Sequence, residues 1–209
     1  MSDLKKLIER IKSAAKQDDW QKGIKLSRTA LDRIQPSQKR EWYAVNLHLA
    51  IFLLEEKPGT ESHIKEAEEI YHKLLESVSK EKESLKWAQL HRNLAYVYDR
   101  KGSGEKGQNI DKAIQHYRQA LSVFSKNEHP EDFAIVSDCL GLAYEERISG
   151  DLHLNLQEAK RCFSNVLAVF TEEKLPEDRQ NTLAHLERVN SKLKMIGSGS
   201  GHVSLGKQP

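Results

Sequence analysis

The sequence Asn-Leu-Ala-Tyr-Val-Tyr at residues 93–98, with the apolar pattern that follows it at residues 113–121, decides the predicted fold of this chain. Small residues stand where two helices must touch, and large residues stand where the space between them must be filled. The set recurs 46 residues later and, more weakly, upstream. The recurring residues are Leu49, Ala50, Leu53, Ala67, Tyr71 and Leu75; Leu94, Ala95, Tyr98, Ala113, Tyr117 and Leu121; and Leu140, Gly141, Tyr144, Ala159, Phe163 and Leu167. Repetition at a fixed spacing predicts stacked units that bury their apolar faces against their neighbours.

These residues resemble the tetratricopeptide repeat (TPR). The segments at residues 111–121 and 130–133 are similar to the long-period TPR arrays of bacteria, including those found beside caspase-like CHAT domains. The usual period is about 34 residues, and both helices of each unit are longer here. The resemblance covers residues 1–196. It implies an all-α, right-handed TPR-like solenoid of about four helix pairs, followed by a C-terminal capping helix. Such a fold provides a surface that binds a partner and does not by itself imply a catalytic activity.

Length, charge and composition bound the class of protein. The 209 residues predict one domain, and the net charge of +2 predicts no bulk attraction to nucleic acid. The basic runs are modest: Lys22, Lys25 and Arg28 form a short one, and acidic residues interrupt the one formed by Lys73, Lys80, Lys82 and Lys86. No signal peptide is visible and no apolar run approaches the roughly 18 residues of a membrane span, so we expect a soluble, cytoplasmic protein. Cys139 and Cys162 fall at core positions and are expected to be buried thiols.

The C-terminal end differs in character from the rest. Residues 1–196 are predicted to form one helical repeat domain, and residues 197–201 (Gly-Ser-Gly-Ser-Gly) to form a flexible linker of the engineered kind. Residues 202–209 (His-Val-Ser-Leu-Gly-Lys-Gln-Pro) do not continue the repeat. We interpret them as a partner-derived peptide fused to its receptor, with a cloning remnant as the alternative.

The resemblance also implies a peptide groove, because the first helix of each TPR pair lines the concave face. The groove positions implied by the family, with their neighbours, are Leu47, Ile51, Leu54, Gln89, Arg92, Asn93, Tyr96, Arg100, Asp138, Leu142 and Glu145. This groove runs from an apolar end to a polar end. In the fused segment, Val203 and Leu205 are expected to be buried at the apolar end. Lys207 is expected to meet one of the two carboxylates at the polar end, Asp138 or Glu145.

No catalytic or metal-binding pattern is found. The nine histidines form no His-Glu-x-x-His, and the sequence contains no Cys-x-x-Cys and no nucleophile elbow. No enzyme activity, metal or cofactor is therefore expected. The glycines between residues 102 and 107 lack the spacing of a phosphate-binding loop. Of the positions that form the carboxylate clamp of chaperone-binding TPR proteins, only Asn93 matches, which argues against chaperone tails as the ligand.

Together these features predict a non-catalytic scaffold or adaptor. Its ligand is expected to be a short linear peptide of a partner protein that contains a segment like residues 202–209. The alternative is a peptide-responsive regulatory module, in which binding changes the curvature of the solenoid and so switches an effector. Bacterial regulators of that kind usually carry a helix-turn-helix domain, and none is apparent in this sequence.

Overall fold

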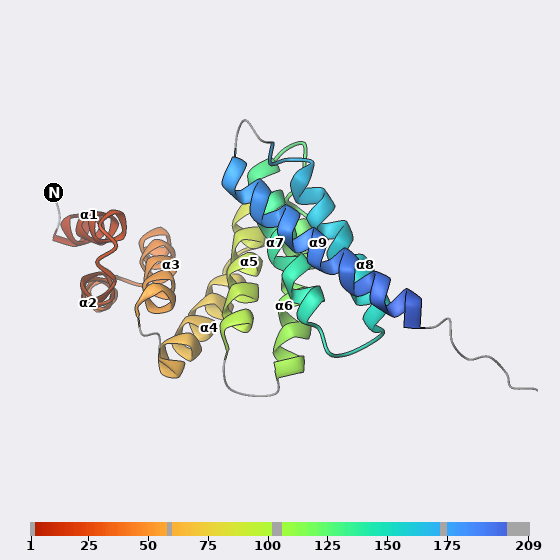
Figure 1. Ribbon diagram of the computed structural model, residues 1–209. Coiled ribbons are helices and arrows are strands. Elements are labelled where there is room, and N and C mark those ends of the chain that lie inside the picture. The colour runs from red at the N-terminus through yellow and green to blue at the C-terminus, as the bar shows by residue number, and fades with distance from the viewer. Residues whose placement is uncertain (1–2, 58–59, 102–105, 172–174, 200–209) are drawn as a thin grey trace, which may run out of the picture. The chain divides into compact units, whose positions relative to one another are not determined.

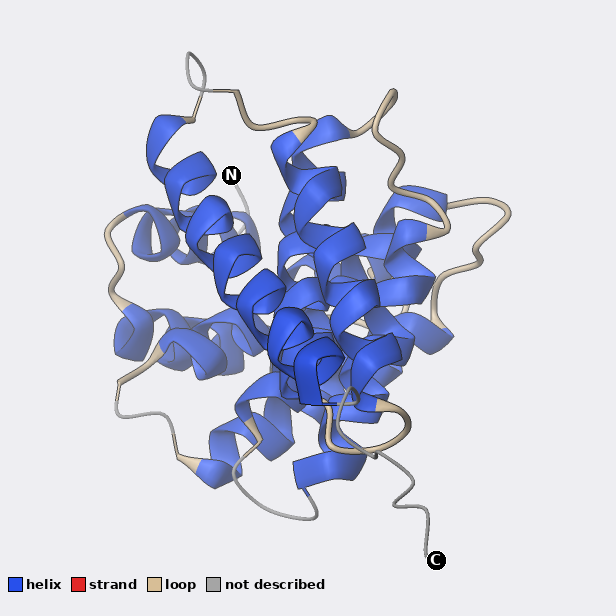
Figure 2. Ribbon diagram, turned by 45° about the vertical axis from the view of Figure 1, so that its right-hand side comes forward, coloured by secondary structure: helices blue, strands red, loops and turns tan. Residues whose placement is uncertain are grey.

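The protein is built from α-helices (Figures 1 and 2). The computed structural model describes residues 3–57, 60–101, 106–171 and 175–199, and these ranges contain no strand. The helices are α1 (Asp3–Lys16), α2 (Trp20–Leu31), α3 (Lys39–Glu55), α4 (Glu61–Glu76), α5 (Ser84–Arg100), α6 (Lys106–Leu121), α7 (Pro130–Glu146), α8 (Leu152–Leu167) and α9 (Pro176–Gly199). The predicted all-α fold class is confirmed.

The repeat seen in the sequence is also present in the bounds of the helices. α3, α5 and α7 are each 17 residues long, and α4, α6 and α8 are each 16. The small residues at the repeated positions are all buried: Ala50, Ala67, Ala95, Ala113, Gly141 and Ala159. Their burial is consistent with the expectation that small side chains stand where helices pack. The first and last helices depart from the pattern, since α1 has 14 residues and α9 has 24.

Side-chain caps determine where three of the helices begin. Asp19, Thr60 and Asp151 each accept a hydrogen bond from the backbone N–H three residues later, at 3.2, 3.2 and 2.8 Å. Each bond satisfies one of the N–H groups that the first turn of a helix leaves without an intrahelical partner. The polar residues between the apolar patterns therefore separate α2, α4 and α8 from the helices before them.

The chain divides into two compact units, Met1–Lys106 and Gly107–Pro209. In the first unit each helix packs against the next, from α1 to α5, and α1 also contacts α3. Trp20 and Trp42 pack against the core of this unit, as expected for apolar residues at helical spacing. Gly23 allows α2 to approach α3 closely, because an added Cβ would lie 2.6 Å from the Phe52 ring.

In the second unit α7 packs against α8, and α8 packs against α9. α6 is joined to the end of α7 by Arg147, whose Nε donates to Asp111 Oδ1 at 2.7 Å. Both cysteines are free thiols, Cys162 buried and Cys139 half-buried. Burial raises the pKa of the Cys162 thiol to about 12, which suits the packing role expected for it.

Two features of the structure lie at or within the predicted domain boundaries. α9 continues to Gly199, three residues into the segment predicted as a linker from residue 197. Propagation of a formed helix adds one hydrogen bond for each residue that it fixes, which offsets part of the conformational entropy that the glycines lose. Residues 1–196, predicted as one repeat domain, contain the division between the two compact units at residues 106 and 107, next to the glycine-containing segment 102–107. The domain bounds remain a prediction. Residues 200–209, with the predicted peptide, lie outside the described residues.

Candidate functional site

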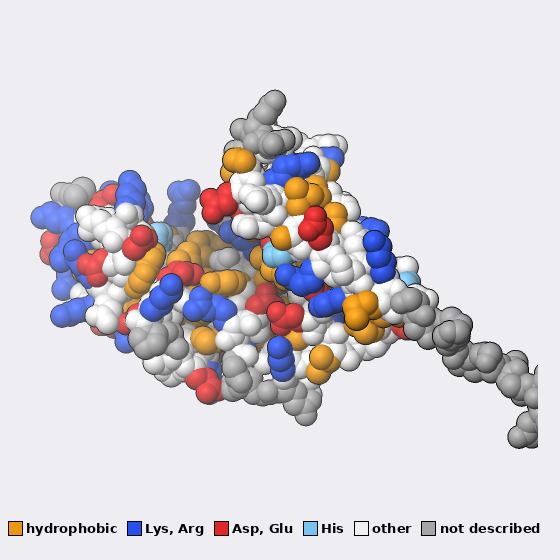
Figure 3. Space-filling view, viewed as in Figure 1, with side chains coloured by type: hydrophobic (Ala, Val, Ile, Leu, Met, Phe, Trp, Pro, Cys, Tyr) orange, Lys and Arg blue, Asp and Glu red, His pale blue; other side chains and the backbone are white. Residues whose placement is uncertain are grey.

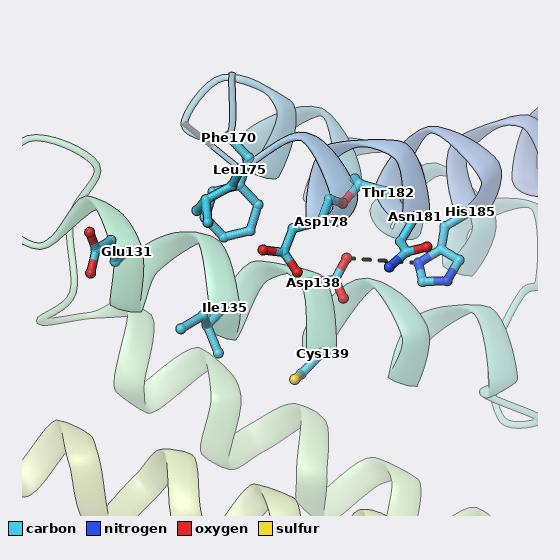
Figure 4. Close-up of a pocket in the computed structure, with 10 residues that line it drawn as sticks. All are labelled: Glu131, Ile135, Asp138, Cys139, Phe170, Leu175, Asp178, Asn181, Thr182 and His185. Atoms are coloured by element: carbon cyan, nitrogen blue, oxygen red, sulfur yellow. Dashed lines mark hydrogen bonds and ion pairs between the residues drawn. The ribbon is translucent and has the colours of Figure 1, made fainter. Parts of the chain in front are cut away.

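The candidate site is a recess in the second unit, between α7 and α9 (Figure 4). Its volume is about 570 Å³, which lies in the range of pockets that take small ligands. Each helix contributes residues about one turn apart, and the segment between α8 and α9 contributes two apolar side chains. The lining residues are Glu131, Ile135, Asp138, Cys139, Phe170, Leu175, Asp178, Asn181, Thr182 and His185. The recess thus unites residues that are far apart in the sequence.

The apolar part of the recess is held in place by the end of α8. Ile135 of α7 is 46% exposed, which leaves aliphatic surface open to a ligand. Phe170 and Leu175 follow α8 and lie against each other in Figure 4. The guanidinium of Arg179 donates to the carbonyl oxygens of Leu167 and Phe170, at 3.2 and 3.0 Å. These bonds join the end of α8 to the start of α9, so the apolar surface is positioned by two helices.

The polar part of the recess is acidic. Asp138 and Asp178 lie next to each other, with His185 on the far side of Asp138 (Figure 4). The Nδ1 of His185 is 3.8 Å from Asp138 Oδ1, and this buried oxygen has no hydrogen-bond partner among the described residues. Burial raises the pKa of Asp138, the Asp178 charge adds to the effect, and His185 opposes it. Hydrogen bonding from His185 and Thr182 also favours the charged form of Asp138, so the capacity to accept a bond from a ligand lies with its Oδ1 atom.

Of the three residues predicted on α7, Asp138 lines the recess and Leu142 is half-buried one turn further on. Glu145, the third of these residues, pairs with cations of the same chain. Its carboxylate accepts from Arg188 Nε and Nη2, both at 2.6 Å, and from Lys192 Nζ at 2.7 Å. The Glu145 side chain is only 5% exposed. Arg188 and Lys192 of α9 pair with this carboxylate, so a peptide lysine would have to compete with them.

The other predicted residues lie in the first unit, on α3 and α5. Tyr96 and Arg100 are brought together, because the guanidinium donates to the Tyr96 hydroxyl oxygen at 2.7 Å. Leu54 needs correction, since it is 3% exposed and belongs to the core rather than to an open face. α3 is apolar over more than one face, and Leu54 lies on a packed one. The remaining predicted residues range from half-buried to exposed: Leu47, Ile51, Gln89, Arg92 and Asn93.

The residues that α9 brings to the recess were not predicted. Asp178, Asn181, Thr182 and His185 recur every three to four positions, which places them on one face of the helix. This polar row was the available signal. A C-terminal capping helix is expected to turn its polar side to solvent. In the structure, the polar row of α9 lines the recess beside α7 instead.

The described residues hold no group of three or more His, Cys, Asp or Glu side chains placed to bind a metal ion. Nor does any helix in the described ranges have the length and apolar character to cross a membrane. No family model matches the chain, and a search of curated proteins finds no match. The argument for a function therefore rests on the geometry and charge of the recess.

The ion pairs of Glu145 lead to a prediction about stability. Glu145→Gln is expected to lower the free energy of unfolding by about 1–2 kcal/mol at neutral pH, because it removes charge-assisted bonds to Arg188 and Lys192. Burial alone would raise the pKa of Glu145, but these bonds outweigh it and lower the pKa. The stabilisation is therefore present above the ordinary pKa of glutamate and is lost as the pH falls through the lowered value.

Urea unfolding of both proteins over a pH series measures this difference. The control is Glu187→Gln, which neutralises an exposed carboxylate on the same helix, α9. A stability difference between the Glu145 variant and the unaltered protein that persisted in strong acid would contradict the role given to these bonds.

Proposed function

We propose that the protein is a non-catalytic interaction module that binds a short linear segment of a partner protein in the recess between α7 and α9. The segment carries a cationic side chain that pairs with Asp138 and Asp178, next to an apolar side chain that covers Ile135. One observation carries this proposal: a half-buried carboxylate, Asp138, with one buried oxygen that lacks a hydrogen-bond partner, beside a second carboxylate and an exposed aliphatic surface.

The energetics of such a ligand follow from the surfaces present. Burial of an aliphatic side chain against Ile135, Phe170 and Leu175 stabilises a complex by about 1.5–3 kcal/mol when it is complete. A lysine or arginine placed between Asp138 and Asp178 relieves the repulsion of two neighbouring carboxylates and supplies donors to an oxygen that has none. The two contributions alone correspond to about millimolar affinity, so tighter binding also requires contacts from the backbone and the other side chains of the segment.

The arrangement of the repeats is part of the same proposal. α7 and α9 both begin at a proline, 46 residues apart, and both correspond to the first helix of a repeat. We take the repeats to stack as a right-handed, TPR-like solenoid with α9 as its last helix, so that the recess belongs to the concave face. A cytoplasmic adaptor without a nucleic-acid ligand is the corresponding biological role.

The C-terminal segment is the first ligand to test. It contains the two kinds of side chain that would complement the recess: the aliphatic Val203 and Leu205 and the cationic Lys207. We propose that it is a fused partner-derived peptide. Only two residues of the predicted linker, 200 and 201, follow the end of α9, and two extended residues span at most about 7 Å. The segment therefore binds either its own chain next to the end of α9 or a neighbouring molecule.

Fluorescence polarisation of a labelled His-Val-Ser-Leu-Gly-Lys-Gln-Pro peptide tests this function on protein that ends at Gly199. Saturable micromolar binding is expected. The affinity should fall about tenfold or more when Asp138 and Asp178 are both changed to Asn, since each charge pair near a protein surface contributes about 0.2–1 kcal/mol or more when partly buried. A control that changes Glu128 and Glu187 to Gln neutralises two exposed carboxylates of the same unit and should bind like the unaltered protein.

Three outcomes contradict the proposal: no binding at millimolar peptide, equal weakening in the control, or unchanged affinity for a peptide with Glu in place of its Lys. The first outcome would also make a cloning remnant the better interpretation of residues 202–209.

Binding is also expected to depend on pH through Asp138. The raised pKa of this carboxyl means that it takes up a proton at a higher pH than an ordinary aspartate. A protonated Asp138 has no charge for a cation, so peptide affinity should fall as the pH is lowered through that pKa. Asp138→Asn should bind more weakly and lose this part of the pH dependence. An identical pH profile in that variant would assign the effect to another group.

A further inference from the structure

A groove between α1 and α2 of the first unit is lined mainly by cations. Its volume is about 520 Å³, and the cations are Lys6 and Arg10 of α1 with Lys22, Lys25 and Arg33 of α2 and the residues just after it. Lys6 and Arg10 are one helical turn apart, as are Lys22 and Lys25, so each pair lies on one face of its helix. Both faces line the same groove. Figure 3 shows Lys and Arg side chains gathered over the end of this unit formed by α1 and α2.

These cations lack the partners that others in the unit have. Arg28, on the same helix, pairs with Glu66 of α4 at 2.8 Å. In the groove, Lys22 lies 3.7 Å from the carboxylate of Asp19. The other four groove cations, Lys6, Arg10, Lys25 and Arg33, make no ion pair with any residue in the described ranges. Like charges held around one groove repel each other, so this arrangement does not serve the stability of the fold.

We propose that this basic groove is a second binding site and that its occupant is an acidic peptide segment of a partner protein. Leu7 and Leu26 form an apolar floor between the two rows of cations, and each is 7% exposed. Carboxylates of the segment pair with the rows, while an apolar side chain between them covers the floor. Asp3 lines one end of the groove, so that end repels a carboxylate. The site shares no residue with the recess of the second unit.

The shape of the groove fits a peptide better than a nucleic acid. The row from Lys22 to Arg33 is about 16 Å long at about 1.5 Å per helical residue. Nucleic acids are bound mainly through phosphates and base edges, which leave a recessed aliphatic floor unused. Peptides that lie in grooves between helices place apolar side chains into such floors and charged ones along the rim. Charge and floor together therefore indicate an acidic segment with interspersed apolar residues.

The test uses a fluorescein-labelled peptide of repeated Glu-Glu-Leu and the full-length protein. Binding is expected to be saturable and to weaken as salt screens the exposed charges. Arg10→Glu combined with Lys25→Glu should weaken it about tenfold or more. The control, Lys65→Glu with Lys73→Glu, reverses two exposed charges of α4 outside the groove and should leave the affinity unchanged. Circular dichroism establishes that both variants are folded.

Absence of saturable binding would overturn the proposal, and so would equal weakening by the two pairs of substitutions, which would reduce the effect to net charge. Tighter binding of a single-stranded oligonucleotide or of phosphatidylserine vesicles, with the same dependence on Arg10 and Lys25, would overturn the peptide as occupant. Asp138→Asn should not affect this binding, which distinguishes the groove from the recess.

Discussion

Replacing Phe163 by alanine is expected to lower the free energy of unfolding of the second unit by about 3–5 kcal/mol. The ring is fully buried on α8, at the position that Tyr71 and Tyr117 occupy in the preceding repeats. Its neighbour across the helix contact is Gly141, which has no side chain to fill the space. The loss therefore has two parts. The variant forfeits the free energy that burial of the ring contributes, and it leaves a cavity that the surroundings cannot close.

The same substitution is expected to weaken ligand binding in the recess. The Phe163 ring lies 5.2 Å from the His185 ring, measured between centroids, and His185 lines the recess beside Asp138. Without the aromatic ring behind it, the imidazole loses the packing that fixes its position. Peptide affinity should fall by less than in the variant that neutralises Asp138 and Asp178, because the carboxylates themselves remain.

Hydrogen exchange of the α7–α9 amides and denaturant unfolding followed by circular dichroism measure the loss of stability. Trp20, Trp42 and Trp87 all lie in the first unit, so tryptophan fluorescence reports on that unit in the same samples. Leu154→Ala is the matched control, because Leu154 is on the same helix and 60% exposed. Its effect should stay within about 0.5 kcal/mol. Equal losses in the two variants would contradict the packing described for α8.

The helices and their repetition could be predicted because the signal is local. Spacing between small and large residues fixes which face of a helix is buried, and polar residues such as Asp19 and Thr60 cap helices only a few positions away. The equal lengths of α3, α5 and α7 follow from the same recurring pattern. Such information lies within one or two turns of sequence, so it can be read without knowing the tertiary contacts.

The site could be predicted only in part, because side-chain pairing between helices has no local signal. The place of Asp138 in the repeat predicts that it reaches a surface, and it lines the recess. Glu145 is another of the groove positions that the family resemblance implies. Its carboxylate pairs with Arg188 and Lys192, which lie 43 and 47 residues further along the chain. Leu54 was likewise assigned to an open face although the core covers it. Repeat position identifies which residues can reach a surface, but the neighbouring helix decides which of them are available.

The basic groove illustrates the same limit in electrostatic terms. Along the chain, Lys22 and Lys25 belong to a short basic run, which by itself supplies only one side of the groove. The other half, Lys6 and Arg10, comes from α1, and the helical hairpin places the two rows across one groove. Net charge also conceals the feature, since the whole chain carries only +2. A concentration of charge that depends on folding is visible only once the two helices are placed together.

Gly141→Val is expected to destabilise the second unit by about 3 kcal/mol, because it forces a side chain into a filled space. A Cβ at this position would lie 2.7–3.0 Å from three atoms of the Phe163 ring. The ring is fully buried and cannot swing aside. Gly141→Ala should be milder, since alanine favours the helix over glycine by about 1 kcal/mol and offsets part of the clash. Denaturant unfolding and hydrogen exchange of α7–α9 measure both changes.

A double-mutant cycle establishes whether the ring is the reason for the glycine. If it is, Gly141→Val combined with Phe163→Ala should be less destabilised than the sum of the single changes by about 1–3 kcal/mol, because the valine then fills the cavity. Strict additivity would contradict this account and assign the glycine to the backbone alone. The preceding repeats carry Ala50 and Ala95 at the equivalent position, so an alanine is compatible with the helix itself. A positive coupling would therefore mean that the size of residue 141 is set by its partner on α8.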